Sequence, residues 1–275
     1  MLTDEQTDAL IETVRAVAKA EILPHFRNLG ALEIDSKSAP DDLVTIADRA
    51  AELAISKAVH DILPDAAIVG EEAVSADKSV LARVKEPGTV VIIDPIDGTW
   101  NYANGVATYG VILAVIEDGE TVFGLLYDPS YDDWIMARKG QGALFCRADG
   151  RREPMQLAPP PDALSDCFGF VGMYLFNAER QAQLAATLPK FRRTQTLRCS
   201  CHEYRLLTQG ASQFCLNGML NVWDHAAGVL IYQEAGGVAR LLDGRSYSPA
   251  MRKGHLLTAA SEPLWEQLSE LFGDE

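Results

Sequence analysis

The chain has little cysteine, fewer basic than acidic residues and no long apolar run, and each of these features excludes a class of protein. Its five cysteines, odd in number and spread over 275 residues, predict free thiols in a reducing cytoplasm rather than a disulfide framework. No stretch approaches the ~18 apolar residues of a membrane span. The N-terminus, Met-Leu-Thr-Asp-Glu-Gln, lacks the basic region and apolar core of a signal peptide. We therefore expect a cytoplasmic protein with no membrane partner.

The charge balance excludes a second class. With 24 Lys and Arg against 39 Asp and Glu, the formal net charge is −15, and so acidic a surface repels the phosphate backbone of a nucleic acid. We therefore expect no nucleic-acid partner. Much of this acidity serves solubility alone. If the ligand is itself an anion, bound cations are needed to reverse the local field.

Length and composition predict two compact halves. The chain is long for one average domain, and 48% of its residues are hydrophobic, enough for a sizeable core. A polar segment that begins at Asp149-Gly150 and runs through three prolines at 159–161 is the best candidate boundary. We predict an N-terminal domain over residues 1–150 and a C-terminal α/β domain over residues 151–275.

The spacing of apolar residues predicts helices first and strands afterwards. Residues 4–26 form one expected helix, and a second runs from Thr45 to about Leu63, where Thr45 and Asp48 have the spacing of a capping box. Short apolar segments separated by Asp-Gly and Lys-Gly turns predict an antiparallel meander over residues 111–146. In the second half we predict a strand at 167–171 and helices at 178–188, 203–209, 224–236 and 262–271, the last after Ser261 as N-cap.

The most informative segment reads Asp94-Pro-Ile-Asp-Gly-Thr99 and follows the apolar run Thr89-Val-Val-Ile-Ile93. Such a run is typical of a buried strand, here expected to end at Pro95. Two carboxylates then lie at a strand end, and hard divalent cations prefer such oxygen ligands. Gly98 and Thr99 can direct backbone N–H groups at an anion, because glycine leaves room for close approach. Metal ligands beside an anion site indicate phosphate chemistry.

Two further motifs give the segment a context. Ala67-Ile-Val-Gly-Glu71-Glu72 reads as a short strand that ends in adjacent acids, and Trp223-Asp224 precedes an apolar helix that ends in Glu234-Ala-Gly-Gly237. Together with Asp94–Thr99, these motifs resemble the signatures of the inositol monophosphatase family, whose members are Mg²⁺-dependent, lithium-inhibited phosphatases. The resemblance extends in order from about Leu43 to Gly237, which is most of the chain.

The resemblance implies a fold and a set of roles. The fold is α/β, a layered αβαβα sandwich of the inositol monophosphatase and fructose-1,6-bisphosphatase type, and the protein is expected to be a homodimer. Two or three Mg²⁺ ions are expected. The implied metal ligands are Glu71, Asp94, the Ile96 carbonyl, Asp97 and Asp224, with Asp94 bridging two ions. The implied catalytic residues are Thr99 and Asp48, which activate water, with Glu71, and the implied substrate contacts are Asp97, Gly98, Thr99 and Asn217.

Each role has a plainer alternative. Asp94 and Asp97 are also good turn formers, and Asp224 could serve only as a helix N-cap. Asp48 could belong only to the capping box with Thr45. Of the two adjacent acids, the family pattern selects Glu71 as ligand and leaves Glu72 exposed to solvent or in a supporting position.

The sequence departs from the family pattern at the substrate side. Many inositol phosphatases carry a Glu seven residues before the helix Asp, where this chain has Asn217. The segment before the preceding helix reads Arg198-Cys-Ser-Cys-His-Glu-Tyr204 instead of Gly-Ser-Ala-Ala-type residues. Some relatives that act on histidinol phosphate have a Cys-containing segment ending in Tyr here. Cys199, Cys201 and His202 could also suggest zinc, although their spacing is wrong for a usual knuckle.

We therefore predict Mg²⁺-dependent hydrolysis of a small-molecule phosphate monoester. The alternatives within the superfamily are histidinol phosphate, fructose 1,6-bisphosphate and a 3′-phosphonucleotide as substrate. An alternative of another class is a non-catalytic regulatory protein on the same fold.

Overall fold

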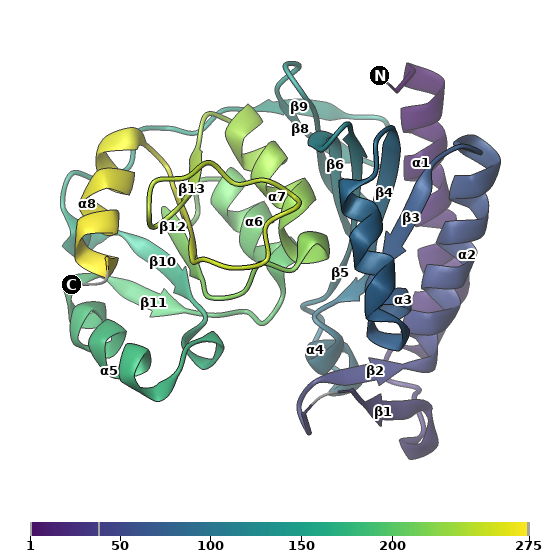
Figure 1. Cartoon of the computed structure of the whole chain (residues 1–275), viewed down its shortest axis with the longest axis horizontal. Helices are drawn as coiled ribbons and strands as arrows, with labels where there is room; N and C mark the ends of the chain where they lie inside the picture. Colours follow the sequence, from purple (N-terminus) through teal and green to yellow (C-terminus); the bar gives the residue numbers. More distant parts are fainter. Residues whose placement is uncertain (1, 38, 274–275) are drawn as a thin grey trace.

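Two β-sheets and three layers of helices alternate through the molecule (Figure 1). The computed structural model describes residues 2–37 and 39–273. Helices α1 and α2 cover the outer face of the larger sheet, α6 and α7 lie between the two sheets, and α5 and α8 cover the smaller sheet. The described helices are α1 (Asp4–Val17), α2 (Ile46–Ile62), α3 (Glu71–Ala76), α4 (Thr99–Ala103), α5 (Ala178–Thr187), α6 (Ser200–Thr208), α7 (Val222–Glu234) and α8 (Glu262–Phe272).

The larger sheet has seven strands in the order β3-β4-β5-β6-β7-β8-β9, antiparallel except for the parallel pair β3 and β4. These strands are β3 (Ala67–Gly70), β4 (Thr89–Asp97), β5 (Gly110–Glu117), β6 (Glu120–Asp128), β7 (Asp133–Arg138), β8 (Ala143–Arg147) and β9 (Arg152–Met155). The predicted meander is therefore present. The sheet continues past residue 150 into β9, and the division into domains at that residue stays a prediction.

The smaller sheet has five strands in the order β11-β10-β12-β14-β13. Its strands are β10 (Phe168–Val171), β11 (Arg193–Gln195), β12 (Phe214–Asn217), β13 (Val238–Leu241) and β14 (Leu256–Ala259). A separate hairpin of β1 (Ile34–Ser36) and β2 (Leu43–Thr45) precedes α2.

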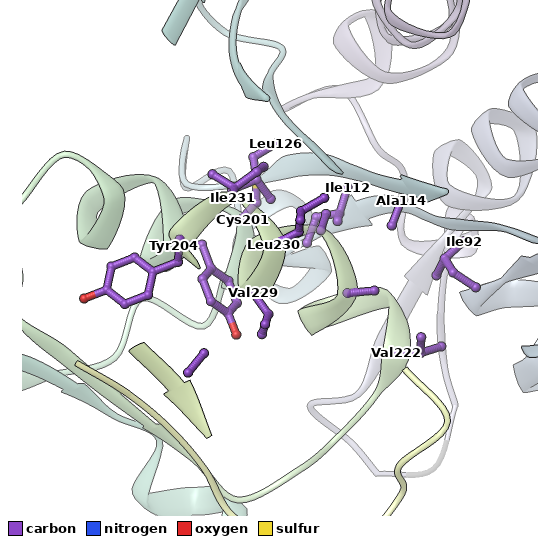
Figure 2. Close-up of a cluster of buried hydrophobic side chains, with 14 of the residues drawn as sticks. Ile92, Ile112, Ala114, Leu126, Cys201, Tyr204, Val222, Val229, Leu230 and Ile231 are labelled. Carbon is purple, nitrogen blue, oxygen red and sulfur yellow. The ribbon is translucent and has the colours of Figure 1, made fainter. Parts of the chain in front are cut away.

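Three apolar cores hold the layers together: one between α1, α2 and the larger sheet, one around α6 and α7 between the two sheets, and one between the smaller sheet and α5 and α8. The central core packs α7 and α6 against the larger sheet, and Figure 2 shows Leu230 and Ile231 of α7 beside Ile112 and Leu126. Because α7 is buried on nearly every side, its sequence is apolar all round rather than amphipathic. That helix carries Asp224 at its N-terminal end, so the core fixes where this carboxylate lies.

Local sequence signals account for the starts of several helices. Thr45 and Asp48 form the predicted capping box of α2, and Ser261 is the N-cap of α8. The first helix is followed by a π-helical segment at Ala18–Ile22 and a 3₁₀ turn at Leu23–His25 before the chain turns away. In the described part of the chain, no helix is both long and apolar enough to cross a membrane.

Three predicted boundaries differ from the structure. Strand β4 does not end at Pro95 but continues to Asp97, since a proline at an irregular point of a strand need not stop it. The helix α6 begins at Ser200, three residues before the predicted start. The N-cap of α7 is Asn221, so Asp224 is the third helical residue and not a cap, and its carboxylate is available for another role.

Candidate active site

The end of β4 brings two aspartates of the motif to one side of the sheet through a β-bulge. Asp94 pairs with Ile112 and Asp97 pairs with Gly110, so two residues of β4 face one residue of β5 between these pairs. In a regular strand, side chains three residues apart point to opposite faces. The extra residue resets this alternation. Asp94 and Asp97 consequently both line one cavity of about 980 Å³.

Asp224 completes a cluster of three carboxylates. Asp94, Asp97 and Asp224 each offer an oxygen atom, and these atoms lie within 4.8 Å of one another. Burial, then the nearby Glu71, Asp97 and Asp224 carboxylates, hold the pKa of Asp94 well above its usual range. Burial and the charge of Asp97 do the same for Asp224. Such crowding is costly for bare carboxylates and favourable once a cation binds.

One atom of this cluster is unsatisfied by protein. Asp94 Oδ1 is buried and has no hydrogen-bond partner within residues 2–37 and 39–273, although buried polar atoms nearly always have one. An oxygen-only donor set with a buried orphan atom fits a hard divalent cation such as Mg²⁺. The residues present therefore suit the metal that the sequence predicts.

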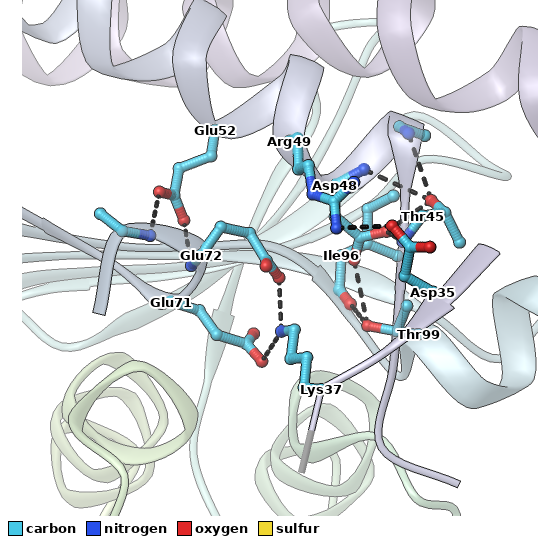
Figure 3. Close-up of polar contacts among 12 residues, drawn as sticks. Asp35, Lys37, Thr45, Asp48, Arg49, Glu52, Glu71, Glu72, Ile96 and Thr99 are labelled. Atoms are coloured by element: carbon cyan, nitrogen blue, oxygen red, sulfur yellow. Dashed lines mark hydrogen bonds and ion pairs between the residues drawn. The ribbon is translucent and has the colours of Figure 1, made fainter. Parts of the chain in front are cut away.

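Glu71 lines the same cavity and is paired with a lysine. Lys37 Nζ lies 2.9 Å from Glu71 Oε1 and 2.6 Å from Glu72 Oε1 (Figure 3). Glu52 of α2 accepts the Glu72 N–H at 2.7 Å, which fixes the start of α3. The prediction that Glu72 is exposed to solvent is wrong, because only 10% of its side chain is accessible. Burial, with the charge of Glu71, raises the pKa of Glu72 to about 7.

Thr99 and Asp48 are in direct contact, as expected of a water-activating pair. Thr99 Oγ1 lies 3.1 Å from Asp48 Oδ1 and 2.9 Å from the Ile96 carbonyl oxygen. The other oxygen of Asp48 accepts the Thr45 backbone N–H at 2.8 Å and the Thr45 hydroxyl. The capping role and the contact with Thr99 thus coexist on one carboxylate. Burial raises the pKa of Asp48 to about 6, against these donors.

Both the backbone conformation at residue 98 and the space around it require glycine. It has φ of +87°, and a Cβ atom there would lie 2.9 Å from the Thr108 carbonyl oxygen and 3.2 Å from Cys199 Cβ. A side chain at this position would be strained and would collide with the neighbouring segment. The turn that places Gly98 and Thr99 in the cavity lining therefore depends on glycine.

The opposite wall of the cavity starts at the N-terminus of α6. Cys201 N–H and the Cys199 thiol, at 3.2 Å, both donate to Asp97 Oδ2. Burial raises the pKa of Asp97 to about 6, and these donors oppose the rise. The Cys201 thiol turns away to the Tyr127 carbonyl, and His202 Nε2 lies 2.9 Å from the Tyr109 carbonyl oxygen. These three side chains have separate partners, which does not favour the zinc alternative.

Asn217, at the end of β12, lines the same wall. It is buried, and its Nδ2 donates to Cys215 Sγ at 3.2 Å. A carboxylate does lie close by, but it comes from Glu203 on α6, whose Oε2 is 3.8 Å from the same sulfur. Sequence spacing alone gives no sign of this neighbour, because 14 residues separate Glu203 from Asn217.

The aromatic residues near the motif divide between cavity and core. Trp100 lines the cavity, while Tyr102 is buried and donates its hydroxyl to the Ile22 carbonyl at 2.6 Å.

His225 is buried beside the cavity, with Nε2 against the Met219 carbonyl and Nδ1 against the Tyr204 hydroxyl. Because a carbonyl only accepts, Nε2 carries the proton and Nδ1 accepts from Tyr204. Burial lowers the pKa of His225 to about 4, so it is neutral.

Sequence reasoning missed two cations of this site. Lys37 lies between the two predicted N-terminal helices, where no role was predicted, and its partners Glu71 and Glu72 are more than 30 residues away. Arg198 was noted only as a departure from the family pattern, although it lines the cavity. Nothing in the local sequence sets either residue apart from the other basic residues of the chain.

Comparison with known proteins identifies the family of this chain. Residues 3–272 match the model of the inositol monophosphatase family. The chain belongs to this family, whose members are phosphatases.

Relatives and solved structures extend the comparison. The Nus factor SuhB of Haemophilus influenzae is 30% identical over 94% of this chain and 93% of its own. The fructose-1,6-bisphosphatase/inositol-1-monophosphatase of Thermotoga maritima is 28% identical over 77% and 76% of the two chains. An inositol monophosphatase structure from Zymomonas mobilis has a TM-score of 0.79 at 25% identity, covering 98% of this chain and 99% of its own. An IMPase structure from Thermotoga maritima has a TM-score of 0.82 at 23% identity, covering 98% and 96%. The predicted layered fold is confirmed.

Proposed function

We propose that this protein hydrolyses a small-molecule phosphate monoester with the help of bound Mg²⁺. The observation that supports this most is the buried cluster of Asp94, Asp97 and Asp224, with an unpartnered Asp94 oxygen, next to the hydrogen-bonded pair of Thr99 and Asp48. A cluster of carboxylates alone could have a purely structural role. Its combination with a hydroxyl–carboxylate pair in one cavity suits hydrolysis.

The residues that would hold the metal are those of the implied ligand set. Asp94, Asp97 and Asp224 already converge, and Glu71 and the Ile96 carbonyl border the same cavity. Bound Mg²⁺ supplies Lewis-acid stabilisation of the phosphate oxygens and lowers the pKa of bound water. Two or three ions are proposed, and Asp94, at the centre of the ligand set, would contribute to holding them. Lys37 pairs with Glu71 through Oε1 at 2.9 Å, so the second carboxylate oxygen of Glu71 would be the one to act as a ligand.

The protein's own groups handle the attacking water and its proton. Thr99 accepts a hydrogen bond from the water and donates its own hydroxyl proton toward Asp48, which is held by Thr45 on its far side. The water oxygen attacks phosphorus, the bond from phosphorus to the alcohol oxygen breaks, and the alcohol leaves with a proton. The products are inorganic phosphate and a free alcohol. The N–H groups of Gly98 and Thr99 are proposed donors to the phosphate oxygens.

The substrate alcohol is proposed to lie against Asn217 and the α6 wall. Inositol 1-phosphate is one candidate, and the relatives differ in their names on this point: one from Mycobacterium tuberculosis is a histidinol-phosphatase and one from Bacillus subtilis an inositol-1-monophosphatase. Histidinol phosphate, fructose 1,6-bisphosphate and a 3′-phosphonucleotide therefore remain the alternatives. The homodimer and the cytoplasmic location stay predictions.

The test is phosphate release from a panel of esters with Mg²⁺ or with EDTA. The panel contains inositol 1-phosphate, histidinol phosphate, fructose 1,6-bisphosphate, a 3′-phosphonucleotide and glycerol 2-phosphate. We expect Mg²⁺-dependent release that EDTA abolishes and fresh Mg²⁺ restores, and inhibition by lithium. The Asp94→Asn protein, purified in the same way, measures any contaminating phosphatase.

Two results would contradict the proposal. Full activity in metal-free buffer would exclude the metal-assisted mechanism. No release from any ester by the folded protein in Mg²⁺ would favour a non-catalytic, regulatory role on this fold.

A further inference from the structure

Resting on the proposed function, we infer that Arg198 is a specificity residue that binds a second anionic group on the substrate alcohol. The substrate class would then be phosphate monoesters whose alcohol carries another phosphate or a carboxylate.

Arg198 lies at the junction of the two cavity walls. It lines the cavity, and its carbonyl oxygen would be 3.3 Å from a Cβ atom added to Gly98. Its side chain extends over Trp100, with the guanidinium carbon 4.7 Å from the ring centroid. Arg198 is therefore adjacent to the phosphate-binding turn, but its contacts are with groups other than Asp94, Asp97 and Asp224.

The guanidinium lies against two aromatic rings. Besides Trp100, the Tyr174 ring centroid is 5.4 Å from the guanidinium carbon, and Tyr174 is 54% exposed. Both distances are in the range of cation–π contacts. Such contacts restrict a long, flexible side chain and leave the edge of the planar group available. The edge is what binds phosphate and carboxylate, often through two parallel hydrogen bonds.

The backbone is arranged to present this side chain. Arg198 has φ of +53°, a conformation that glycine adopts freely and other residues rarely do. The turn is held by the buried carboxylate of Glu203, which accepts the Leu197 N–H at 2.7 Å and the Thr196 hydroxyl at 3.0 Å. The Arg198 N–H in turn donates to Thr196 Oγ1 at 3.2 Å. Glu203 is thus a positioning residue for Arg198.

The ion pair that the Arg198 guanidinium makes in the structure is weak and can be exchanged. Arg198 Nη2 lies 3.1 Å from Asp41 Oδ2 on the loop between β1 and β2, and the Asp41 side chain is 58% exposed. Exposed ion pairs of this kind contribute little stability. The other N–H groups of this guanidinium make no hydrogen bond to the part of the chain that the structure describes. A substrate anion can therefore bind there at small cost, by joining or replacing Asp41.

A competing explanation is that Arg198 only anchors the β1–β2 loop through Asp41. The two explanations differ in their response to Asp41→Asn. If Arg198 is an anchor, Asp41→Asn and Arg198 variants should impair all esters in the same proportion. If Arg198 binds a substrate anion, Asp41→Asn removes a competitor and should favour doubly anionic esters.

The experiment compares matched ester pairs that differ in one anionic group. Inositol 1-phosphate is paired with inositol 1,4-bisphosphate, and glycerol 2-phosphate with 2-phosphoglycerate, at saturating Mg²⁺. The proteins are wild type, Arg198→Gly, Arg198→Lys and Asp41→Asn. Gly suits the left-handed backbone, so this variant should fold, and Lys keeps the charge while losing the planar fork. The readout is the ratio of kcat/KM between the two members of each pair.

We expect Arg198→Gly to lower the ratio of doubly to singly anionic ester by about tenfold, since a hydrogen bond to a charged group is worth roughly that factor or more. Arg198→Lys should retain part of the ratio, and Asp41→Asn should raise it. A fall confined to one pair identifies the second group as phosphate or as carboxylate. An unchanged ratio in Arg198→Gly overturns the inference, and so does an equal loss on both members, which would place Arg198 on the scissile phosphate or on the loop.

Calorimetric binding of the same four compounds makes the test independent of turnover. Tighter binding of the doubly anionic member by wild type, lost in Arg198→Gly, supports the inference even if no ester is hydrolysed. Equal binding by both proteins overturns it. Failure of the proposed function appears instead as absent Mg²⁺-dependent phosphate release by wild type.

Discussion

The two walls of the cavity are built in different ways. On the β4 wall, Asp94, Asp97 and Thr99 come from six consecutive residues, and a bulge and a left-handed glycine set their directions. On the α6–β12 wall, Glu203 and Asn217 come from separate elements and Arg198 from the turn before α6, and side-chain contacts hold that turn and Asn217 in place. The first wall depends on backbone geometry and suits the chemistry common to all phosphate esters. The second depends on a few side chains and suits the choice of alcohol.

The strongest test of this division is Asp94→Asn. The amide keeps the shape of the side chain but removes its charge and directs N–H groups toward the cation. We expect a loss of at least about a thousandfold in kcat, roughly 4 kcal/mol of barrier, on every ester of the panel alike. Thermal unfolding in EDTA should show an equal or higher melting temperature than wild type, because crowding of buried carboxylates is relieved. A near-wild-type rate would remove the β4 wall from the chemistry.

The next test is Thr99→Val, with Thr99→Ser as the matched control. Valine keeps the volume and removes the hydroxyl that donates to Asp48. General-base contributions are typically a hundredfold or more, so we expect kcat to fall by at least about a hundredfold while Thr99→Ser retains most of it. KM should change little. Equal activity of the Val and Ser variants would show that the hydroxyl is not used.

On the opposite wall, Glu203→Gln tests a buried carboxylate through stability. Burial raises the pKa of Glu203 from 4.5 to about 7, so the folded protein holds this proton more tightly than the unfolded chain does. The resulting stabilisation is complete below about pH 4.5 and is lost as the pH rises through about 7. It amounts to at most roughly 3 kcal/mol.

Urea unfolding in EDTA between pH 4.5 and 7.5 measures this effect. We expect the unfolding free energy of Glu203→Gln to depend less on pH than that of wild type. Glu266→Gln, at an exposed position of α8, is the control. If both variants follow the wild-type pH dependence, Glu203 does not carry this proton.

The smallest expected effect is that of Asn217→Glu, which restores the carboxylate of many inositol phosphatases. Hydrogen bonds to a charged group exceed neutral ones by about 1 kcal/mol, so KM for inositol 1-phosphate should fall by about fivefold. Glycerol 2-phosphate, with fewer hydroxyl groups, should change less, and the metal and phosphate contacts cancel in the comparison. Equal changes for both esters would mean that Asn217 does not contact the alcohol.

The same division explains how much could be predicted from the sequence. Asp48, Thr99 and the capping box were predictable because the residues concerned are close in sequence or follow family motifs, and the layered fold followed from the same resemblance. The continuation of β4 past Pro95 could not be predicted, because no residue type clearly signals a bulge. Lys37 and Glu203 were also missed, because their importance comes from partners that only the fold brings near.

The bulge at Pro95 makes the catalytic segment tolerant in one respect and intolerant in another. Replacing Ile96 by another apolar residue does not change the face of the sheet to which each side chain of β4 points. Inserting one further residue between Asp94 and Asp97, with the bulge kept, turns one aspartate to the opposite face of the sheet, and deleting one residue removes the bulge that sets their spacing. Among related sequences, the number of residues between Asp94 and Asp97 should therefore vary less than their identity. Insertions and deletions there should be far rarer than substitutions.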